Sequence, residues 1–385
     1  MGPLFIIGIF FSFFLQFLLF SKKNKTVVDK ILGSWMFFIG LHLLNYYAYH
    51  LGYWNKYPHL TGITHPFPLI YGPFLYLYVV FSIRKTQIFR NKDFLHFLPA
   101  ILSYLYMFPY FFLYSEEKKR LVDSGQLTDY RVFMMVSLVG FVVSGVAYAI
   151  LAYRLIGRFN KMVHENLSYD ENINLNWLQY CILGVLGIFL TVGFFSAIQY
   201  LFHLNLPFNP DFIYYSEVIL FILFIGYFGI RHESLFIENV SVETVQEEEK
   251  PENKTSAEYK KSGLKTDDAE VYHNQLLQLM TSKKPFLEPK LTLNTLANEL
   301  DITVNHLSQV INQFQGKNFY DFVNEYRIEE FKTRALSTKN RHLSLLALAL
   351  DSGFNSKSSF NSVFKKHTRM TPSQFLEKEK QEQTI

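Results

Sequence analysis

Apolar residues form seven long, uninterrupted runs in the first part of this chain, and shorter helical patterns follow in its last third. The runs cover residues 4–20, 31–51, 67–83, 94–114, 132–153, 178–206 and 212–230. A helix rises about 1.5 Å per residue, so each run can cross a hydrocarbon layer about 30 Å thick. Seven such segments exceed what a soluble core can bury, and continuous hydrophobicity disfavours a β-barrel. The pattern therefore predicts a bundle of seven membrane-spanning helices.

Basic residues in the loops between the runs predict the orientation of this bundle. The first, third and fifth loops hold eleven Lys and Arg residues, whereas the other side holds five. Because Lys and Arg concentrate in cytoplasmic loops, we expect the N-terminus outside and the C-terminus in the cytoplasm. No basic residue precedes residues 4–20, which favours an uncleaved span over a cleaved signal peptide.

Composition supports this division of the chain. Of 385 residues only 18% are charged, below the roughly 25% of soluble domains, and most of the charge follows residue 230. The single cysteine, Cys181, excludes an intrachain disulfide and a cysteine metal site, and we expect no metal and no cofactor. The net charge of +4 is too small to indicate nucleic acid by itself.

A polar stretch separates the apolar part from the C-terminal part. Residues 238–268 are rich in Glu and Lys and predict a flexible tether. The alternative is a helical extension of the last span, which Pro251 would interrupt. We therefore expect a membrane region at residues 1–237, a linker at 238–268 and a helical domain at 269–385.

Two similar helical patterns follow the linker. In the first, Thr303 is a suitable N-cap and Gly316 a suitable C-cap for a helix with apolar residues at helical spacing. In the second, Ser356 can cap a helix that turns Phe360 and Phe364 inward. Each helix follows a shorter one across a tight turn, as in a helix-turn-helix unit. The fold class is thus all-α, with two such units joined by a helix over residues 319–331.

The second pattern resembles the C-terminal signature of AraC/XylS-type regulators. The resemblance rests on residues 351–360 (DSGFNSKSSF), 364–368 (FKKHT) and 370–375 (MTPSQF), and extends over about residues 270–375. The whole architecture resembles bacterial regulators that place this domain after several spans. It implies a non-enzymatic, sequence-specific transcription regulator in the bacterial inner membrane, which senses a signal through its bundle.

Two residues depart from the family pattern. Arg369 stands where the family usually has Gly before Met-Thr-Pro. A Gly there suggests a left-handed backbone, so Arg is expected either to bear a small strain or to shift the turn. Phe331 stands where many members have Ala, which is expected to alter packing of the joining helix but not the function.

The expected DNA contacts lie on the second helix of each unit, which enters the major groove. The first unit offers Asn305, His306, Ser308 and Gln309, of which all but His306 match contact positions of the family. The second unit offers Lys357, Ser358, Ser359, Asn361, Ser362, Lys365 and Lys366. Residues 352–376 hold four basic and no acidic side chains, whereas residues 291–316 hold no basic ones. The second unit is thus expected to attract phosphates and the first to read bases.

Polar groups inside the runs suggest where a signal enters. Glu217 is the one charged residue within the seven apolar runs. Asn45, Gln199 and Tyr71 are expected at a similar depth in the membrane. These four residues are a candidate pocket for an unknown small-molecule or membrane signal, although Glu217 is equally suited to packing between helices.

The partners expected are double-stranded DNA and the lipid bilayer, and a homodimer remains open. The alternative function is a membrane receptor or transporter whose tail binds a protein.

Overall fold

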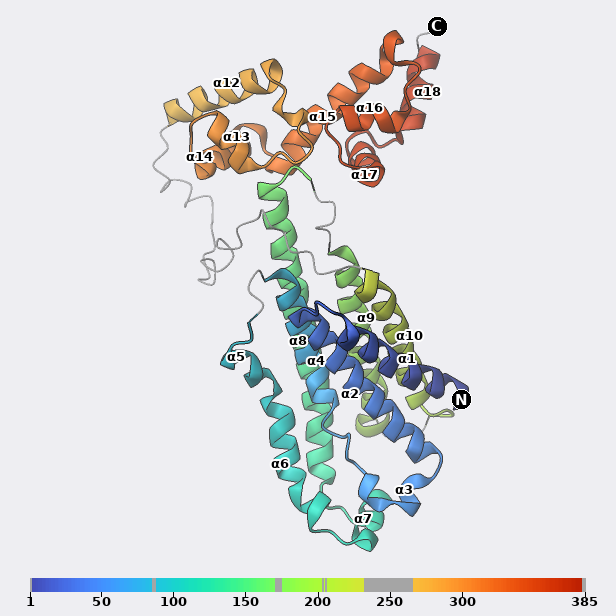
Figure 1. Ribbon diagram of the computed structural model, residues 1–385. Helices are drawn as coiled ribbons and strands as arrows, with labels where there is room; N and C mark the ends of the chain where they lie inside the picture. Colours follow the sequence, from blue (N-terminus) through green and yellow to red (C-terminus); the bar gives the residue numbers. More distant parts are fainter. Residues whose placement is uncertain are drawn as a thin grey trace. The chain divides into compact units, whose positions relative to one another are not determined.

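The computed structural model describes residues 2–84, 88–169, 175–202, 204, 206–231 and 266–382, and every regular element among them is a helix (Figure 1). This confirms the predicted all-α fold. The chain divides into two compact units. Of the described residues, 2–157 and 175–231 belong to the first unit, and 158–169 and 266–382 belong to the second. The predicted linker lies outside the described residues up to residue 265, and its last three residues begin a helix.

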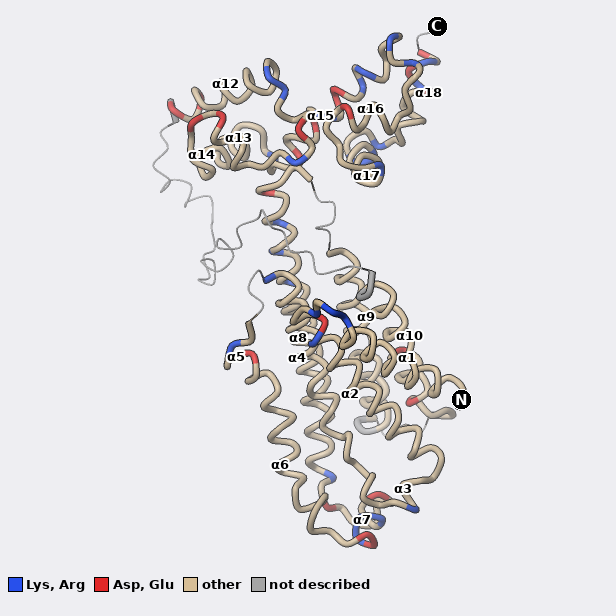
Figure 2. Tube along the Cα trace, in the orientation of Figure 1, with Lys and Arg blue, Asp and Glu red and all other residues tan. Residues whose placement is uncertain are grey.

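The first unit consists of apolar helices and short connecting helices. They are α1 (Gly2–Ser21), α2 (Val27–His50), α3 (Tyr53–Lys56), α4 (Pro68–Ile83), α5 (Asn91–Phe94), α6 (Leu98–Phe112), α7 (Glu116–Asp123), α8 (Arg131–Asn166), α9 (Asn176–Ser196) and α10 (Asp211–Arg231). Figure 2 shows that charged residues of this unit gather near helix ends and leave long uncharged stretches between them. That distribution fits a membrane region.

Six helical stretches among the described residues are long and apolar enough to cross a membrane. They are Gly2–Ser21, Val27–His50, Asn91–Phe112, Arg131–Asn166, Asn176–Gln199 and Asp211–Phe228. The predicted third run forms α4, a shorter apolar helix of 16 residues. Pro68 starts α4 and the extended backbone at Arg84 ends it, so α4 is about 24 Å long at about 1.5 Å per residue. The structure therefore gives six full-length candidates where the sequence predicts seven.

Close packing joins α1, α2 and α10. A Cβ atom at Gly8 would lie 2.6 Å from Ile219, and one at Gly226 would lie 2.7 Å from Leu15, so these glycines let α1 and α10 approach each other. Trp35 of α2 is 1% exposed, and its ring centroid lies 5.3 Å from that of Phe221 in α10. Small residues at contact points are the usual way in which membrane helices pack.

The second unit contains the predicted helix-turn-helix pairs. Its helices are α12 (Thr266–Ser282), α13 (Leu293–Glu299), α14 (Val304–Val310), α15 (Phe319–Leu336), α16 (Leu345–Asp351), α17 (Lys357–Thr368) and α18 (Pro372–Glu382). The last turns of α8 also belong to it. One apolar core lies among α12, α13, α14 and the start of α15, and a second lies among the rest of α15, α16 and α17.

The helix ends follow the sequence signals. The hydroxyls of Thr303 and Ser356 accept hydrogen bonds from backbone N–H groups of α14 and α17, as predicted for N-caps. Gly316 has φ +63° after α14 and its π-helical turn, and Arg369 has φ +63° after α17. The left-handed backbone expected at Arg369 is therefore present. Phe331 is fully buried against Phe360 and Phe364 in the second core.

Candidate nucleic-acid interface

The first recognition helix, α14, is held by a short turn and by α12. Asp301 adopts φ +54° in the turn from α13 to α14, a conformation that Asp tolerates better than most residues. On the side of α12, the Tyr272 ring stacks on His306 with centroids 6.3 Å apart. The His273 ring stacks on Phe314 at 4.6 Å, and α12 therefore covers one side of α14.

This cover changes the expected set of outward residues. Asn305 is exposed and His306 and Ser308 are half-buried, but Gln309 is only 8% exposed. The expected outward position of Gln309 is wrong for two reasons. The helix α12 packs against α14, and α14 continues into a π-helical turn at Ile311–Gln315. Such a turn contains more residues than an α-turn and changes which positions share a face.

Asn312 joins the exposed side of the first recognition helix. It is exposed, and its amide donates to the backbone carbonyl of Ser308 over 2.9 Å. The same amide lies 3.4 Å from the Ser308 hydroxyl, so Asn312 and Ser308 are neighbours on the exposed side of this helix.

The second recognition helix, α17, presents the polar residues that the sequence predicts. Ser359 is half-buried, and the other six are exposed: Lys357, Ser358, Asn361, Ser362, Lys365 and Lys366. The ammonium of Lys366 forms an ion pair with Asp321 of α15 at 2.6 Å. No ion pair is found for Lys357 or Lys365 within the described residues. These two lysines are therefore the better candidates for phosphate contacts.

A buried guanidinium links the two helix-turn-helix units. Arg327 in the middle of α15 is 1% exposed, and its Nε donates to the carbonyl of Phe286 over 2.8 Å. Its Nη2 donates to the carbonyl of Glu288 over 2.8 Å. Gly353, which precedes the second recognition helix, lies against the same site, since a Cβ atom there would be 2.3 Å from the Phe286 carbonyl oxygen. These contacts set the positions of α14 and α17 relative to each other.

Three of the four residues predicted as a signal pocket have separate hydrogen-bond partners. Asn45 donates to Thr64 over 3.0 Å, Tyr71 bonds His42 over 2.8 Å, and Glu217 accepts from Thr191 over 3.1 Å. Gln199 is exposed. Among the described hydrogen bonds, none joins two of the four. The partners Thr64, His42 and Thr191 went unpredicted because the rotation of each helix is not readable from one sequence.

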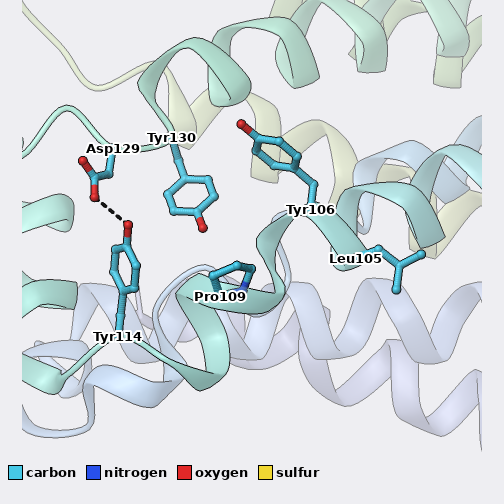
Figure 3. A pocket seen from close by; sticks show the side chains of 6 residues that line it. All are labelled: Leu105, Tyr106, Pro109, Tyr114, Asp129 and Tyr130. Atoms are coloured by element: carbon cyan, nitrogen blue, oxygen red, sulfur yellow. Dashed lines mark hydrogen bonds between the residues drawn. The ribbon is translucent and has the colours of Figure 1, made fainter.

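A pocket of about 540 Å³ lies elsewhere in the first unit, between α6 and the start of α8 (Figure 3). It is lined by Leu105, Tyr106, Pro109, Tyr114, Asp129 and Tyr130. The Tyr114 hydroxyl donates to Asp129 over 2.5 Å, and the Lys118 ammonium lies 3.7 Å from the centre of the Tyr114 ring. Hydrogen bonds from Tyr114 and Lys118 lower the pKa of the Asp129 carboxyl. The carboxylate that lines the pocket is therefore already paired with the nearby Lys118 ammonium.

Comparison with known proteins adds information on the second unit. The family described as "Helix-turn-helix domain" matches residues 296–378, which include α14 and α17. The chain is 33% identical over 85 residues to "Probable transcription factor PqrA" of Proteus vulgaris, which is 22% of this chain and 67% of that protein. It is 26% identical over 117 residues to "Transcriptional regulatory protein HptR" of Staphylococcus aureus, which is 30% of this chain and 44% of that protein. The chain thus spans less than half of HptR. No solved structure matches the chain significantly.

Proposed function

Because the C-terminal region of this chain belongs to the AraC-type helix-turn-helix family, we propose that the chain is a membrane-bound, sequence-specific DNA-binding transcription regulator. The observation that carries the proposal is the pair of helix-turn-helix units, each with a capped recognition helix and an exposed polar face. The names of PqrA and HptR, a transcription factor and a transcriptional regulatory protein, support the same role.

The two helix-turn-helix units have different roles in the proposed DNA contact. Asn305, Ser308 and Asn312 on α14 are neutral hydrogen-bonding groups, and such groups discriminate base edges in the major groove. Lys357 and Lys365 on α17 are exposed cations that attract phosphates regardless of sequence. Gln309 supports α14 from the buried side and is left out of the base contacts.

The membrane part of the proposal rests on the six long apolar helices, the shorter apolar helix α4 and the basic loops. In this arrangement all seven helices span the bacterial inner membrane, the N-terminus lies outside, and the second unit lies in the cytoplasm beside the chromosome. The polar residues 238–265 then act as a tether, and the bundle receives the signal.

The test uses full-length protein in detergent and duplexes that it selects from a randomised pool. Asn305→Ala is expected to weaken binding mostly at one base position, by about 1–3 kcal/mol. Lys365→Ala is expected to weaken binding to every duplex and to reduce the salt dependence. Lys378→Ala, on the exposed side of α18, is the matched control. Selection of no duplex by the full-length protein would favour the alternative, a tail that binds a protein.

A further inference from the structure

The end of α8 is part of the DNA-binding unit. This helix runs without a break for 36 residues from Arg131 to Asn166, and its residues from Arg158 onward belong to the second unit. Residues 164–168, which we term the docking segment, contact that unit at several points. The sequence predicts this region only as a basic loop between two spans.

Backbone pairing holds the last residues of the docking segment. Leu167 is 2% exposed and forms an antiparallel bridge with Thr292, the N-cap residue of α13. The N–H of Ser168 donates to the Leu291 carbonyl over 3.2 Å, and its hydroxyl donates to the same oxygen over 2.8 Å. The segment is therefore attached to the first helix-turn-helix unit.

Ser168 also completes the environment of Arg327. Nη1 of Arg327 donates to the Ser168 carbonyl over 2.7 Å, and Nη2 donates to the Ser168 hydroxyl over 3.0 Å. Asn324 donates to the same carbonyl over 3.2 Å. Burial lowers the pKa of Arg327 to about 10, so the guanidinium stays charged at neutral pH. A buried charge needs all its hydrogen-bond partners, and Ser168 supplies two of them.

The other end of the docking segment reaches the second core. The His164 ring stacks on Tyr320 with centroids 4.5 Å apart and an angle of 18°. Tyr320 packs in the second core, and the next residue, Asp321, pairs with Lys366 of α17. The docking segment thus contacts the first helix-turn-helix unit through Leu291 and Thr292. It also contacts the joining helix α15 through Arg327 and the second apolar core through Tyr320.

We propose that the docking segment is an intramolecular clamp, through which the position of α8 sets the relative orientation of the two helix-turn-helix units. This inference rests on the proposed DNA-binding function. Two recognition helices that enter successive major grooves must match a repeat of about 10 base pairs. When docked, the clamp fixes the spacing between the two recognition helices. When it is released, each helix-turn-helix unit can still contact DNA, but the spacing between their recognition helices varies. A displacement of α8 then regulates specific binding without covering either recognition helix.

The first test measures docking in full-length protein in detergent. Leu167→Cys with Thr292→Cys, in a Cys181→Ser background, is expected to form a disulfide after copper-phenanthroline oxidation. Bridged residues on antiparallel strands lie within the roughly 7 Å between Cα atoms that a disulfide needs. The control pairs Leu167→Cys with Leu336→Cys, which lies about 14 Å further along α15 than Arg327. Equal cross-linking of both pairs would show that the segment does not dock there.

The second test measures spacing on duplexes selected by the wild-type protein from a randomised pool. Ser168→Pro removes the N–H and the hydroxyl of the clamp, and His164→Ala removes the stacked ring. Each is expected to weaken binding to the selected duplex about tenfold, or about 1.4 kcal/mol, with little change on a mixed-sequence duplex. Insertion of one base pair between the half-sites should then weaken the variants less than the wild type. Arg158→Ala, at an exposed position of α8 before the docking segment, is the matched control.

The outcomes separate the clamp from the proposed function. If the wild-type protein selects no duplex, the proposed DNA-binding function is wrong. The cross-linking test then decides by itself whether the docking segment docks. If the wild type selects a duplex and both clamp variants bind it as tightly and with the same spacing preference, the clamp is wrong. Equal loss on selected and mixed-sequence duplexes also contradicts it, because that result indicates a damaged domain rather than a released orientation.

Discussion

Replacement of Arg369 by Gly should stabilise the DNA-binding unit. Arg369 is exposed and holds φ +63° at the end of α17, where its N–H donates to the Lys365 carbonyl over 2.9 Å. A left-handed conformation costs a residue with a Cβ about 1–2 kcal/mol. Gly relieves this strain but raises the backbone freedom of the unfolded chain, which costs about 0.5–1 kcal/mol. The net gain expected for Arg369→Gly is about 0.5–1 kcal/mol.

The first helix-turn-helix unit provides the matched control. Gly316 also has φ +63° at the end of its recognition helix, and a Cβ atom there would meet nothing within 4 Å. Gly316→Ala therefore introduces the strain without a clash and should destabilise by a similar amount. Arg369→Ala removes the charge but keeps the backbone strain, so it should leave stability nearly unchanged.

The assay is urea unfolding of residues 266–385, which contain the side chains of both apolar cores. The parent fragment and its variants all lack Ser168, so its contacts with Arg327 cancel in the comparison. The free energy of unfolding is extrapolated for the parent fragment and the three variants. A lower stability of Arg369→Gly, or shifts of the same sign for Arg369→Gly and Gly316→Ala, would refute the strain argument. DNA binding is measured in parallel, and the loss of the Arg369 charge should weaken it equally in the Gly and Ala variants.

Three further predictions test packing, topology and the bundle. Phe331→Ala should destabilise the same fragment by about 3–5 kcal/mol in urea unfolding, because Phe331 is fully buried against Phe360 and Phe364; a loss below about 1 kcal/mol would mean that the core closes around the missing ring. A reporter enzyme that is active only outside the cytoplasm should be silent when fused after Ile385, and activity there would reverse the orientation. Glu217→Gln keeps an acceptor for Thr191 but removes the charge, so a signal role predicts normal insertion and DNA binding with a lost or locked response in a promoter assay; loss from the membrane indicates packing, and an unchanged response excludes Glu217.

Features that depend on neighbouring residues could be predicted from the sequence. Thr303 and Ser356 cap their helices because a hydroxyl and an N–H three residues later satisfy each other locally. Gly316 and Arg369 mark helix ends because the backbone there must turn left-handed. The helical spacing of the apolar residues likewise predicts which side chains form the cores of the two helix-turn-helix units. These signals lie within one or two turns of the chain, so tertiary context rarely overrides them.

Features that depend on distant segments could not be predicted. Gln309 is buried because α12, some 30 residues earlier, packs on α14 and because a π-helical turn follows. Their positions along the apolar runs predict a similar membrane depth for Glu217 and Asn45. Their hydrogen-bond partners, Thr191 and Thr64, depend on how each helix is rotated about its axis. The role of Ser168 depends on Arg327, more than 150 residues later, and nothing in the local sequence marks a serine in a basic loop as buried.

The chain passes between the two units three times, at residues 157/158, 174/175 and 242/243, and the first and last of these connections differ in what they can transmit. The composition of the polar residues 238–265 predicts a flexible tether, and a flexible tether passes on no rotation. The helix α8 has a continuous backbone from Arg131 to Asn166 and leads directly to Leu167 and Ser168, which are buried in the second unit. Ser168 hydrogen-bonds with Leu291 and Arg327 there. A rotation or translation of such a helix displaces Ser168 from a charged group that needs it. If the bundle regulates DNA binding, we therefore propose that the fifth predicted span, α8, carries the signal to the clamp.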